Sequence, residues 1–307
     1  MPSILFVKTS SLGDVVHNCP AVSDVARRLP GAEIDWIVEE GFAELAAMHA
    51  SVRRVIPIAI RRWRAAAWRP AVWSEIGEFR RRLAAQRYDA VIDTQSLLKS
   101  ALVSACAAGT RHGMDRGSAR EPLAALFYDV RHEIPRGLHA VERNRRLAAV
   151  ALGFPVDPQV DYGLRAPPAA ARSSHVVLLT MTSRADKLWP EARWIELARS
   201  LGGPLVLPWG SPAERERAER IAGELAQASV PPRMTLDELR ALFLDARAVI
   251  GVDTGLTHLA AALGTPTVGI YCGSDPALTG LYGVPGATNV GGPGRPPGVA
   301  EVLGALR

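Results

Sequence analysis

Two charged side chains flank the first loop of the chain, at a spacing that could support proton transfer. The loop runs Lys8-Thr-Ser-Ser-Leu-Gly-Asp14, after a short apolar run and before a segment with helical spacing. An aspartate near a helix start caps the helix and favours its dipole, but a carboxylate there can also take a proton from a substrate hydroxyl. Lys8 would keep Asp14 ionised or bind an acidic substrate. Position alone leaves both roles of Asp14 open.

The same loop lacks the glycine patterns that bind dinucleotides or nucleoside triphosphates. It matches neither GxGxxG nor the Walker A pattern, which argues against NAD chemistry and NTP hydrolysis. The three cysteines, Cys19, Cys106 and Cys272, are far apart and form no CxxC pair. A zinc site or a disulfide framework is therefore not expected, and a reducing compartment such as the cytoplasm fits. We expect neither a cofactor nor a metal.

A second candidate site lies in Gly251-Val-Asp-Thr-Gly-Leu-Thr-His258, where a strand pattern gives way to an apolar helix pattern. Asp253, Thr254 and Gly255 would place backbone N–H groups and a hydroxyl at a helix start, which can bind an anion. Gly255 also lets a ligand approach the backbone closely. His258, one turn later, could contact a phosphate or a sugar, or it could be an ordinary core or capping residue.

Two further loops offer groups suited to a nucleotide. Thr182 and Ser183 carry hydroxyls and Lys187 a point charge just after a strand, a combination that suits a diphosphate. The alternative is a helix-capping loop with a surface lysine. Glu214 begins a charged helix, where it could stabilise the helix dipole or accept hydrogen bonds from a ribose or sugar hydroxyl.

Arginines and tryptophans gather in the first half of the chain. Arg61, Arg62 and Arg64 surround Trp63, and Trp68 follows shortly after. They could form a solvated loop with its tryptophans buried, or a site for an anionic, amphipathic acceptor near a bilayer, because arginine grips phosphate and tryptophan favours the membrane interface. No zinc-finger, RNP or helix-turn-helix signature accompanies them, so nucleic acid is not an expected partner.

A second basic cluster includes Arg120, His139 and Arg143. If its last part is helical, His139 and Arg143 share a face at i and i+4 spacing and could bind acceptor carboxylates. The structural alternative pairs Arg143 with Glu142 or Glu121.

Strand and helix patterns alternate along the chain, and a proline-rich window over 155–168 divides them. This rhythm predicts an α/β protein with two Rossmann-like domains, residues 1–160 and 161–307, that face a central cleft and bind ligands at the carboxyl ends of their strands. The expected strands are 4–8, 34–38, 54–60, 88–93, 175–180, 205–208, 248–252 and 267–271, and the expected helices are 15–28, 73–86, 99–108, 190–201, 213–226, 236–245 and 255–263.

Length and charge agree with this picture. The chain has 307 residues, which favours two domains. Its net charge of +5 suits anionic partners. We expect no signal peptide and no transmembrane span, because no apolar run is long enough.

Many of these segments together resemble the ADP-heptose:lipopolysaccharide heptosyltransferase family, glycosyltransferase family 9, which has a GT-B fold. The likeness is greater to its type I than to its type II members, through EEGF at 39–42 and IRRWR at 60–64. It runs in order through almost the whole chain, in KTSSLGDVVH (8–17), DWIVEEGF (35–42), RVIPIAIRRWR (54–64), YDAVID (88–93), LLKSAL (97–102), HGMD (112–115), AREPLA (119–124), HAVER (139–143), DKLWPE (186–191), LPWGSP (207–212) and VDTGLTHLAAALGTP (252–266).

The resemblance implies an inverting, metal-independent transfer of L-glycero-D-manno-heptose from ADP-L-glycero-β-D-manno-heptose to the Kdo of Kdo2-lipid A, at the cytoplasmic face of the inner membrane. It implies that Asp14 is the catalytic base and that the first half binds the acceptor through Arg61, Arg62, Arg64 and Arg120. Lys8, His139 and Arg143 are further acceptor-binding candidates, from their residue types and spacing. It also implies that the donor is held by Thr182, Ser183, Lys187, Glu214, Asp253, Thr254, Gly255 and His258.

Two alternatives stay open: a type II enzyme that acts on an already heptosylated core, and a non-catalytic protein that binds nucleotide or lipid A. The chain also departs from the family. Leu188 stands where a histidine is frequent, and the glycine- and proline-rich tail after about residue 292 leaves little for a closing helix on the first domain.

Overall fold

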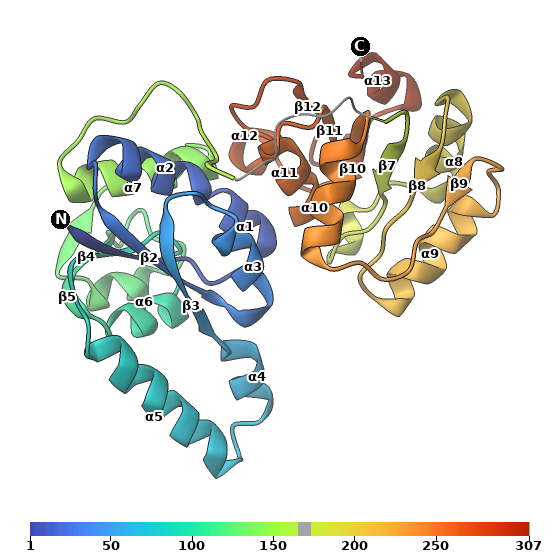
Figure 1. The fold of residues 1–307 in the computed structure, drawn as a ribbon. Helices are drawn as coiled ribbons and strands as arrows, with labels where there is room; N and C mark the ends of the chain where they lie inside the picture. The colour runs from blue at the N-terminus through green and yellow to red at the C-terminus, as the bar shows by residue number, and fades with distance from the viewer. Residues whose placement is uncertain (165–172, 307) are drawn as a thin grey trace. The chain divides into compact units, whose positions relative to one another are not determined.

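The computed structural model describes residues 1–164 and 173–306, which form parts of two compact units, Met1–Leu164 and Arg165–Arg307 (Figure 1). The boundary predicted between residues 160 and 161 falls four residues before this division. Pro167 and Pro168 of the predicted linker lie outside the described residues.

The first unit is built on a six-stranded parallel sheet in the order β3-β2-β1-β4-β5-β6. This is the strand order of a dinucleotide-binding Rossmann sheet, with β1 and β4 adjacent at the point where the order reverses. The loops after these two strands therefore meet at one edge. The strands are Ser3–Val7 (β1), Glu33–Glu39 (β2), Val52–Ile58 (β3), Arg87–Asp93 (β4), Ala108–Met114 (β5) and Val130–His132 (β6).

Seven helices accompany this sheet. The helix expected over 15–28 is broken in two, because the ring of Pro20 would clash with the carbonyl of Val16 in a continuous helix. The helices are Leu12–Val16 (α1), Cys19–Arg28 (α2), Ala43–Ala47 (α3), Ile60–Ala65 (α4), Pro70–Ala84 (α5), Leu98–Ser104 (α6) and Ala140–Leu152 (α7), with 3-10 turns at Glu40–Phe42 and Pro122–Phe127.

The basic IRRWR segment is a helix, not the loop considered from the sequence. Helices α4 and α5 form a hairpin beside β3, the edge strand of the sheet (Figure 1). Trp63 and Phe79 meet edge to face, with ring centroids 5.8 Å apart, and pack against the core residues Ile58 and Leu83. Burial of these rings holds the hairpin on the sheet.

The second unit repeats the same topology. Its parallel sheet has the order β12-β11-β10-β7-β8-β9, which is again two runs diverging from a central pair, here β7 and β10. The strands are Val176–Leu179 (β7), Leu205–Val206 (β8), Ala228–Ser229 (β9), Ala248–Val252 (β10), Thr267–Tyr271 (β11) and Ala287–Gly291 (β12).

The helices of the second unit complete its core. The C-terminal helix α13 packs on α8 of the same unit, where Val299 and Val302 join the cluster around Trp194. The short tail is therefore used within the second unit. The helices are Glu191–Ser200 (α8), Pro212–Ala222 (α9), Leu236–Asp245 (α10), Gly255–Ala262 (α11), Pro276–Thr279 (α12) and Val299–Gly304 (α13), with a 3-10 turn at Ala185–Lys187.

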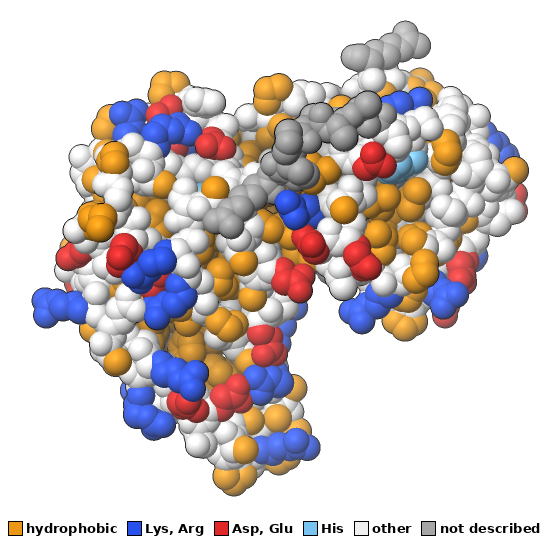
Figure 2. Space-filling view, viewed as in Figure 1, with side chains coloured by type: hydrophobic (Ala, Val, Ile, Leu, Met, Phe, Trp, Pro, Cys, Tyr) orange, Lys and Arg blue, Asp and Glu red, His pale blue; other side chains and the backbone are white. Residues whose placement is uncertain are grey.

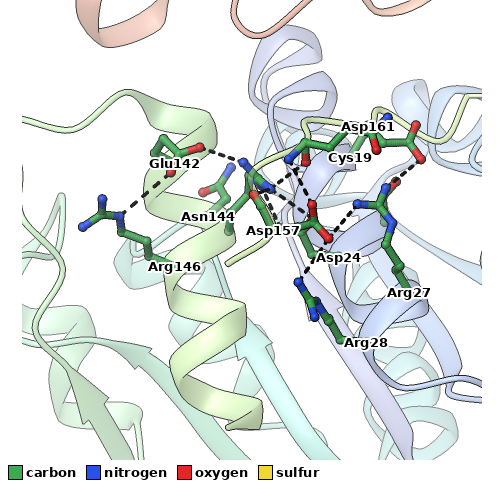
Figure 3. A network of polar contacts seen from close by, with 12 residues as sticks. Cys19, Asp24, Arg27, Arg28, Glu142, Asn144, Arg146, Asp157 and Asp161 are labelled. Atoms are coloured by element: carbon green, nitrogen blue, oxygen red, sulfur yellow. Dashed lines mark hydrogen bonds and ion pairs between the residues drawn. The ribbon is translucent and has the colours of Figure 1, made fainter. Parts of the chain in front are cut away.

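A buried ionic network ties the last segment of the first unit to α2 and α7 (Figure 3). The guanidinium of Arg145 donates to both oxygens of Asp24, at 2.7 and 3.2 Å, and to Glu142 at 2.9 Å. It also donates to the backbone carbonyls of Asp157 and Gln159. Because one buried side chain satisfies all these acceptors, it fixes the path of the chain after α7.

No helix among the described residues has the length and apolar character needed to span a bilayer.

Candidate functional site

Asp14 lies in the first turn of α1, at the carboxyl end of β1. Its Oδ2 accepts hydrogen bonds from the backbone N–H and the hydroxyl of Ser11, at 3.0 and 3.3 Å, which caps the helix. Its Oδ1 lies 3.6 Å from the guanidinium of Arg120, and the side chain is 26% exposed. Oδ2 thus caps the helix while Oδ1 faces the guanidinium of Arg120. The capping role therefore leaves Oδ1 to accept a proton from a substrate.

Lys8 is buried rather than open to solvent, with 4% of its surface exposed. Its ammonium donates to the carbonyl of Thr94 at 3.0 Å and to Oδ1 of Asn144 at 3.5 Å. Burial lowers the pKa of Lys8, and the charge of Asp14 partly offsets this effect. Lys8 therefore interacts electrostatically with Asp14 from a buried position, while its direct contact with an acceptor stays a prediction.

The loop after β4 and the first turn of α6 supply two residues, Gln95 and Lys99, to which the sequence had assigned no role. Gln95 accepts from both the N–H and the hydroxyl of Thr9, at 2.6 and 2.7 Å, and donates to the carbonyl of Ser10 at 2.7 Å. Lys99 donates to the hydroxyl of Ser10 at 2.9 Å, and burial lowers its pKa while nearby Glu39 opposes the shift. The adjacency of β1 and β4 in a Rossmann sheet is the signal that could have pointed to them.

The arginines of α4 have different surroundings. Arg62 bridges Glu40 and Glu75, donating to Glu75 at 2.7 and 2.9 Å, and it lowers the pKa of Glu75 to about 2. The guanidinium of Arg61 lies 5.3 Å from the ring centre of Phe42. Arg64 is exposed. The donors of Arg62 are thus used in ion pairs within the first unit. Arg61 and Arg64 keep N–H donors that could bind an anionic group.

The second basic cluster is partly structural. Arg143 pairs with neither Glu142 nor Glu121, which corrects that alternative: its guanidinium donates to the carbonyl of Ser118 at 2.5 Å, while Glu142 pairs with Arg145. Burial and the charges of nearby Arg136 and Arg120 lower the pKa of Arg143.

His139 is the N-cap of α7. Its Nδ1 accepts from the N–H of Val141 at 3.2 Å, and its ring meets His17 edge to face, with centroids 5.5 Å apart. His139 therefore precedes the helix and is buried as its cap, and only Arg143 of the pair lies within α7.

A cavity of about 330 Å³ lies elsewhere in the first unit, between β3 and the α4–α5 hairpin. Its lining includes Arg62, Trp63 and Phe79 but neither Asp14 nor Lys8. Most charged side chains at its rim form ion pairs with one another. We therefore place the chemistry at the loop after β1, where several polar side chains lie close together.

Asp253 is the centre of the second cluster, at the carboxyl end of β10. It accepts from Lys187 at 2.6 Å, from His258 at 3.3 Å, and from the hydroxyl of Ser274. Burial raises the pKa of this carboxyl, but the hydrogen bonds from the three donors outweigh it and lower the pKa well below its usual range. The sequence did not point to Ser274, which lies in the turn after β11. Its position next to Asp253 follows from the pairing of β10 with β11, which the sequence does not reveal.

The residues around Asp253 form a small polar surface. Thr182 donates to the carbonyl of Asp253 at 2.9 Å, whereas Ser183 is exposed. Helix α11 begins at Gly255 with Thr254 as its N-cap, so the N–H groups of its first turn point out of the helix end beside Lys187. A positive charge, a hydroxyl and helix N–H groups together can bind a diphosphate.

A glycine allows α11 to approach its strand closely. A Cβ on Gly251 would lie 2.2 Å from the hydroxyl oxygen of Thr257, which donates to the carbonyl of Val252 at 2.8 Å. The motif therefore needs glycine at position 251 for packing, while close approach of a ligand to Gly255 stays a prediction.

Glu214 has the structural role considered from the sequence. Its carboxylate accepts from the N–H groups of Gly210 and Ser211, at 2.6 and 3.2 Å, and completes a capping box at the start of α9. Its ribose contact stays a prediction. No group of three or more metal-ligating side chains occurs among residues 1–164 and 173–306.

Comparison with known proteins adds independent information. The model of glycosyltransferase family 9 (heptosyltransferase) matches residues 76–294. Lipopolysaccharide heptosyltransferase 1 of Salmonella typhimurium is 47% identical over 289 residues, which cover 91% of each chain.

Two solved structures of an E. coli heptosyltransferase, WaaC, are also similar. The structure with ADP has a TM-score of 0.89 and 45% identity, and the match covers 98% of this chain and 96% of that one. The structure with ADP-2-deoxy-2-fluoro heptose has a TM-score of 0.86 and 43% identity, with 99% and 97% covered. The predicted α/β fold with two Rossmann-like domains of the GT-B kind is confirmed. With a family model that spans most of the chain and close relatives along nearly its full length, this protein belongs to glycosyltransferase family 9, the heptosyltransferases.

Proposed function

We propose that this glycosyltransferase moves L-glycero-D-manno-heptose from ADP-L-glycero-β-D-manno-heptose to the Kdo of Kdo2-lipid A, in the synthesis of the lipopolysaccharide inner core. The observation that carries the proposal is the likeness, over nearly the full chain, to a heptosyltransferase solved with ADP-2-deoxy-2-fluoro heptose. The polar surface around Asp253 agrees with a nucleotide diphosphate sugar as the donor.

The donor half of the proposal rests on charge. A nucleoside diphosphate carries negative oxygens, and Lys187 and the first N–H groups of α11 offer a positive charge and aligned donors for them. As the bond between C1 of the heptose and the diphosphate breaks, the electron pair leaves with ADP. These groups stabilise that developing charge, so the proposed reaction requires no metal.

The acceptor half rests on Asp14. Its Oδ1 takes the proton from the Kdo hydroxyl, and the hydroxyl oxygen attacks C1 from the face opposite ADP. A single displacement inverts the configuration at C1. The guanidinium of Arg120 lies 3.6 Å from Oδ1, where it can orient the carboxylate toward the acceptor hydroxyl.

The acceptor is a membrane lipid, so the proposed site of action is the cytoplasmic face of the inner membrane, with the protein bound peripherally. Arg61 and Arg64 extend from α4 as candidate contacts for acceptor phosphates or carboxylates.

One assay separates this proposal from its alternatives. The purified protein is incubated with ADP-heptose and either Kdo2-lipid A or the same acceptor already carrying a heptose, and product and ADP release are measured. Transfer to Kdo2-lipid A alone is expected. Transfer only to the heptosylated acceptor would identify a type II enzyme, and ADP-heptose binding without turnover on either acceptor would identify a binding protein.

A further inference from the structure

Two large apolar side chains are exposed at the tip of the α4–α5 hairpin. Trp68, in the turn between the helices, is 74% exposed and Trp73, in the first turn of α5, is 64% exposed. The indole of Trp73 donates to the carbonyl of Ala67 at 2.9 Å, so its ring is held on the turn. Tryptophan is rarely left in water without a partner surface.

The same hairpin carries the excess positive charge of the protein. Residues 60–82 contain seven arginines and two glutamates, a net charge of +5 that equals the net charge of the entire chain. The rest of the chain is therefore neutral on balance. Glu75 and Glu78 pair with Arg62 and Arg82.

Near the tip, the arginines stay open to solvent. Arg64 and Arg69 are exposed, and no acidic side chain among the described residues forms an ion pair with them. The face drawn in Figure 2 shows hydrophobic side chains and basic side chains next to each other at the end of the unit where Figure 1 places this hairpin. The exposed indoles of Trp68 and Trp73, together with Arg64 and Arg69, match the two parts of an anionic lipid surface, since indoles settle at the headgroup level and arginines attract anionic headgroups.

We infer that the tip of the α4–α5 hairpin, with Trp68, Trp73, Arg64 and Arg69, is the surface by which this protein binds an anionic phospholipid bilayer. The inference rests on the proposed function in placing the protein at a membrane, and it adds which residues make the contact. The hairpin stands beside β3 at the edge of the sheet, so its tip can enter the headgroup layer without disturbing the loop at Asp14.

The test measures lipid binding without donor or acceptor. Purified full-length protein is mixed with vesicles of phosphatidylcholine, with or without phosphatidylglycerol, and the partition coefficient is obtained by co-sedimentation. Trp68→Ala should lower binding to the anionic vesicles about tenfold, because the variant no longer transfers an indole ring from water into the bilayer on binding. Arg69→Glu should lower it by about tenfold or more, and added salt should do the same.

Matched controls separate this surface from general effects. Leu126→Ala removes a side chain that is 59% exposed elsewhere in the first unit, and Arg233→Glu makes the same charge change in the second unit. Both should bind vesicles like the wild type. Phospholipids brominated near the headgroup should quench tryptophan fluorescence in the wild type and less in Trp68→Phe.

Three results would overturn the inference: equal losses in Trp68→Ala and Leu126→Ala, binding that does not depend on phosphatidylglycerol, or binding of a DNA duplex or an acidic peptide through Arg69 in place of vesicles. Failure here is distinct from failure of the proposed transfer. Trp68→Ala should still transfer heptose to a Kdo acceptor without acyl chains, whereas a protein that binds vesicles through the tip and transfers nothing would refute the transfer alone.

Discussion

The ammonium of Lys187 lies 2.6 Å from Oδ2 of Asp253, and the two side chains come from loops after the adjacent strands β7 and β10. The pair is nearly enclosed, with side-chain exposures of 19% and 7%. Asp253 therefore orients a cation beside the start of α11, and the diphosphate of a donor would find that cation already in place.

Lys187→Gln should weaken ADP binding by about tenfold to a hundredfold, the range expected for loss of a charge-assisted hydrogen bond. Isothermal titration with ADP measures the change. Lys99→Gln is the control, because Lys99 belongs to the first unit and should leave ADP affinity unaltered. Equal affinities in all three proteins would mean that Lys187 has only a structural role.

Asp14→Asn should lower kcat for transfer by about a hundredfold or more, since the amide cannot accept the proton of the acceptor hydroxyl. ADP binding should persist. Stability should change little, because the amide oxygen can still accept the hydrogen bond from the N–H of Ser11. Asp237→Asn, at an exposed position on α10, controls for the change of charge. Normal turnover by Asp14→Asn would remove Asp14 from the base role.

Stability of the second unit should fall in acid through Asp253. Its pKa is lowered in the folded protein, whereas an unfolded aspartate titrates near about 3.9. The carboxyl of Asp253 thus binds a proton more weakly in the folded state than in the unfolded state. Its contribution to the free energy of unfolding is therefore complete above the pKa of the unfolded state, and it is lost as the pH falls toward the pKa of the folded state. Urea unfolding of the wild type and Asp253→Asn between about pH 6 and pH 3 should show a steeper loss for the wild type. Parallel profiles would contradict the prediction.

Gly251→Ala should destabilise the second unit by about 1–3 kcal/mol, because the added methyl would overlap the hydroxyl of Thr257 and push α11 from β10. Gly202→Ala is the control, since no atom lies within 4 Å of the position that its added methyl would occupy. Thermal unfolding compares the two. A drop in ADP affinity for Gly251→Ala is also expected, because α11 carries the first N–H groups of the site.

Arg145→Met should cost about 3–5 kcal/mol, since it leaves the carboxylate of Asp24 buried without its partner. The double variant Asp24→Leu/Arg145→Met should regain part of this loss, because no buried charge is left unpaired. Urea unfolding of both variants measures the difference. A double variant as unstable as Arg145→Met would mean that the backbone contacts of Arg145 at Asp157 and Gln159 dominate.

Local patterns in the sequence were enough to predict several elements with the bounds that the structure has. Helix α10 and strands β10 and β11 span the expected residues, because each has a clear apolar period and a turn signal at both ends. Strand β9 has two residues, too few to produce a period, and it was missed, as were β5, β6 and β12. The motif around Asp253 was also visible, since strand, turn and helix start are consecutive in the chain.

Contacts between distant segments needed the tertiary structure. Gln95 and Lys99 lie more than 80 residues from the loop they hold, and their hydrogen bonds to Thr9 and Ser10 follow from the pairing of β1 with β4. The sequence by itself determined which side chains could do chemistry at Asp14 and Asp253, because side-chain type and local turns are encoded in neighbouring residues. The tertiary structure decided which oxygen of Asp14 is left for a substrate, that Lys8 is buried, and that Ser274 reaches Asp253, because burial and long-range hydrogen bonds depend on how the strands are ordered in each sheet.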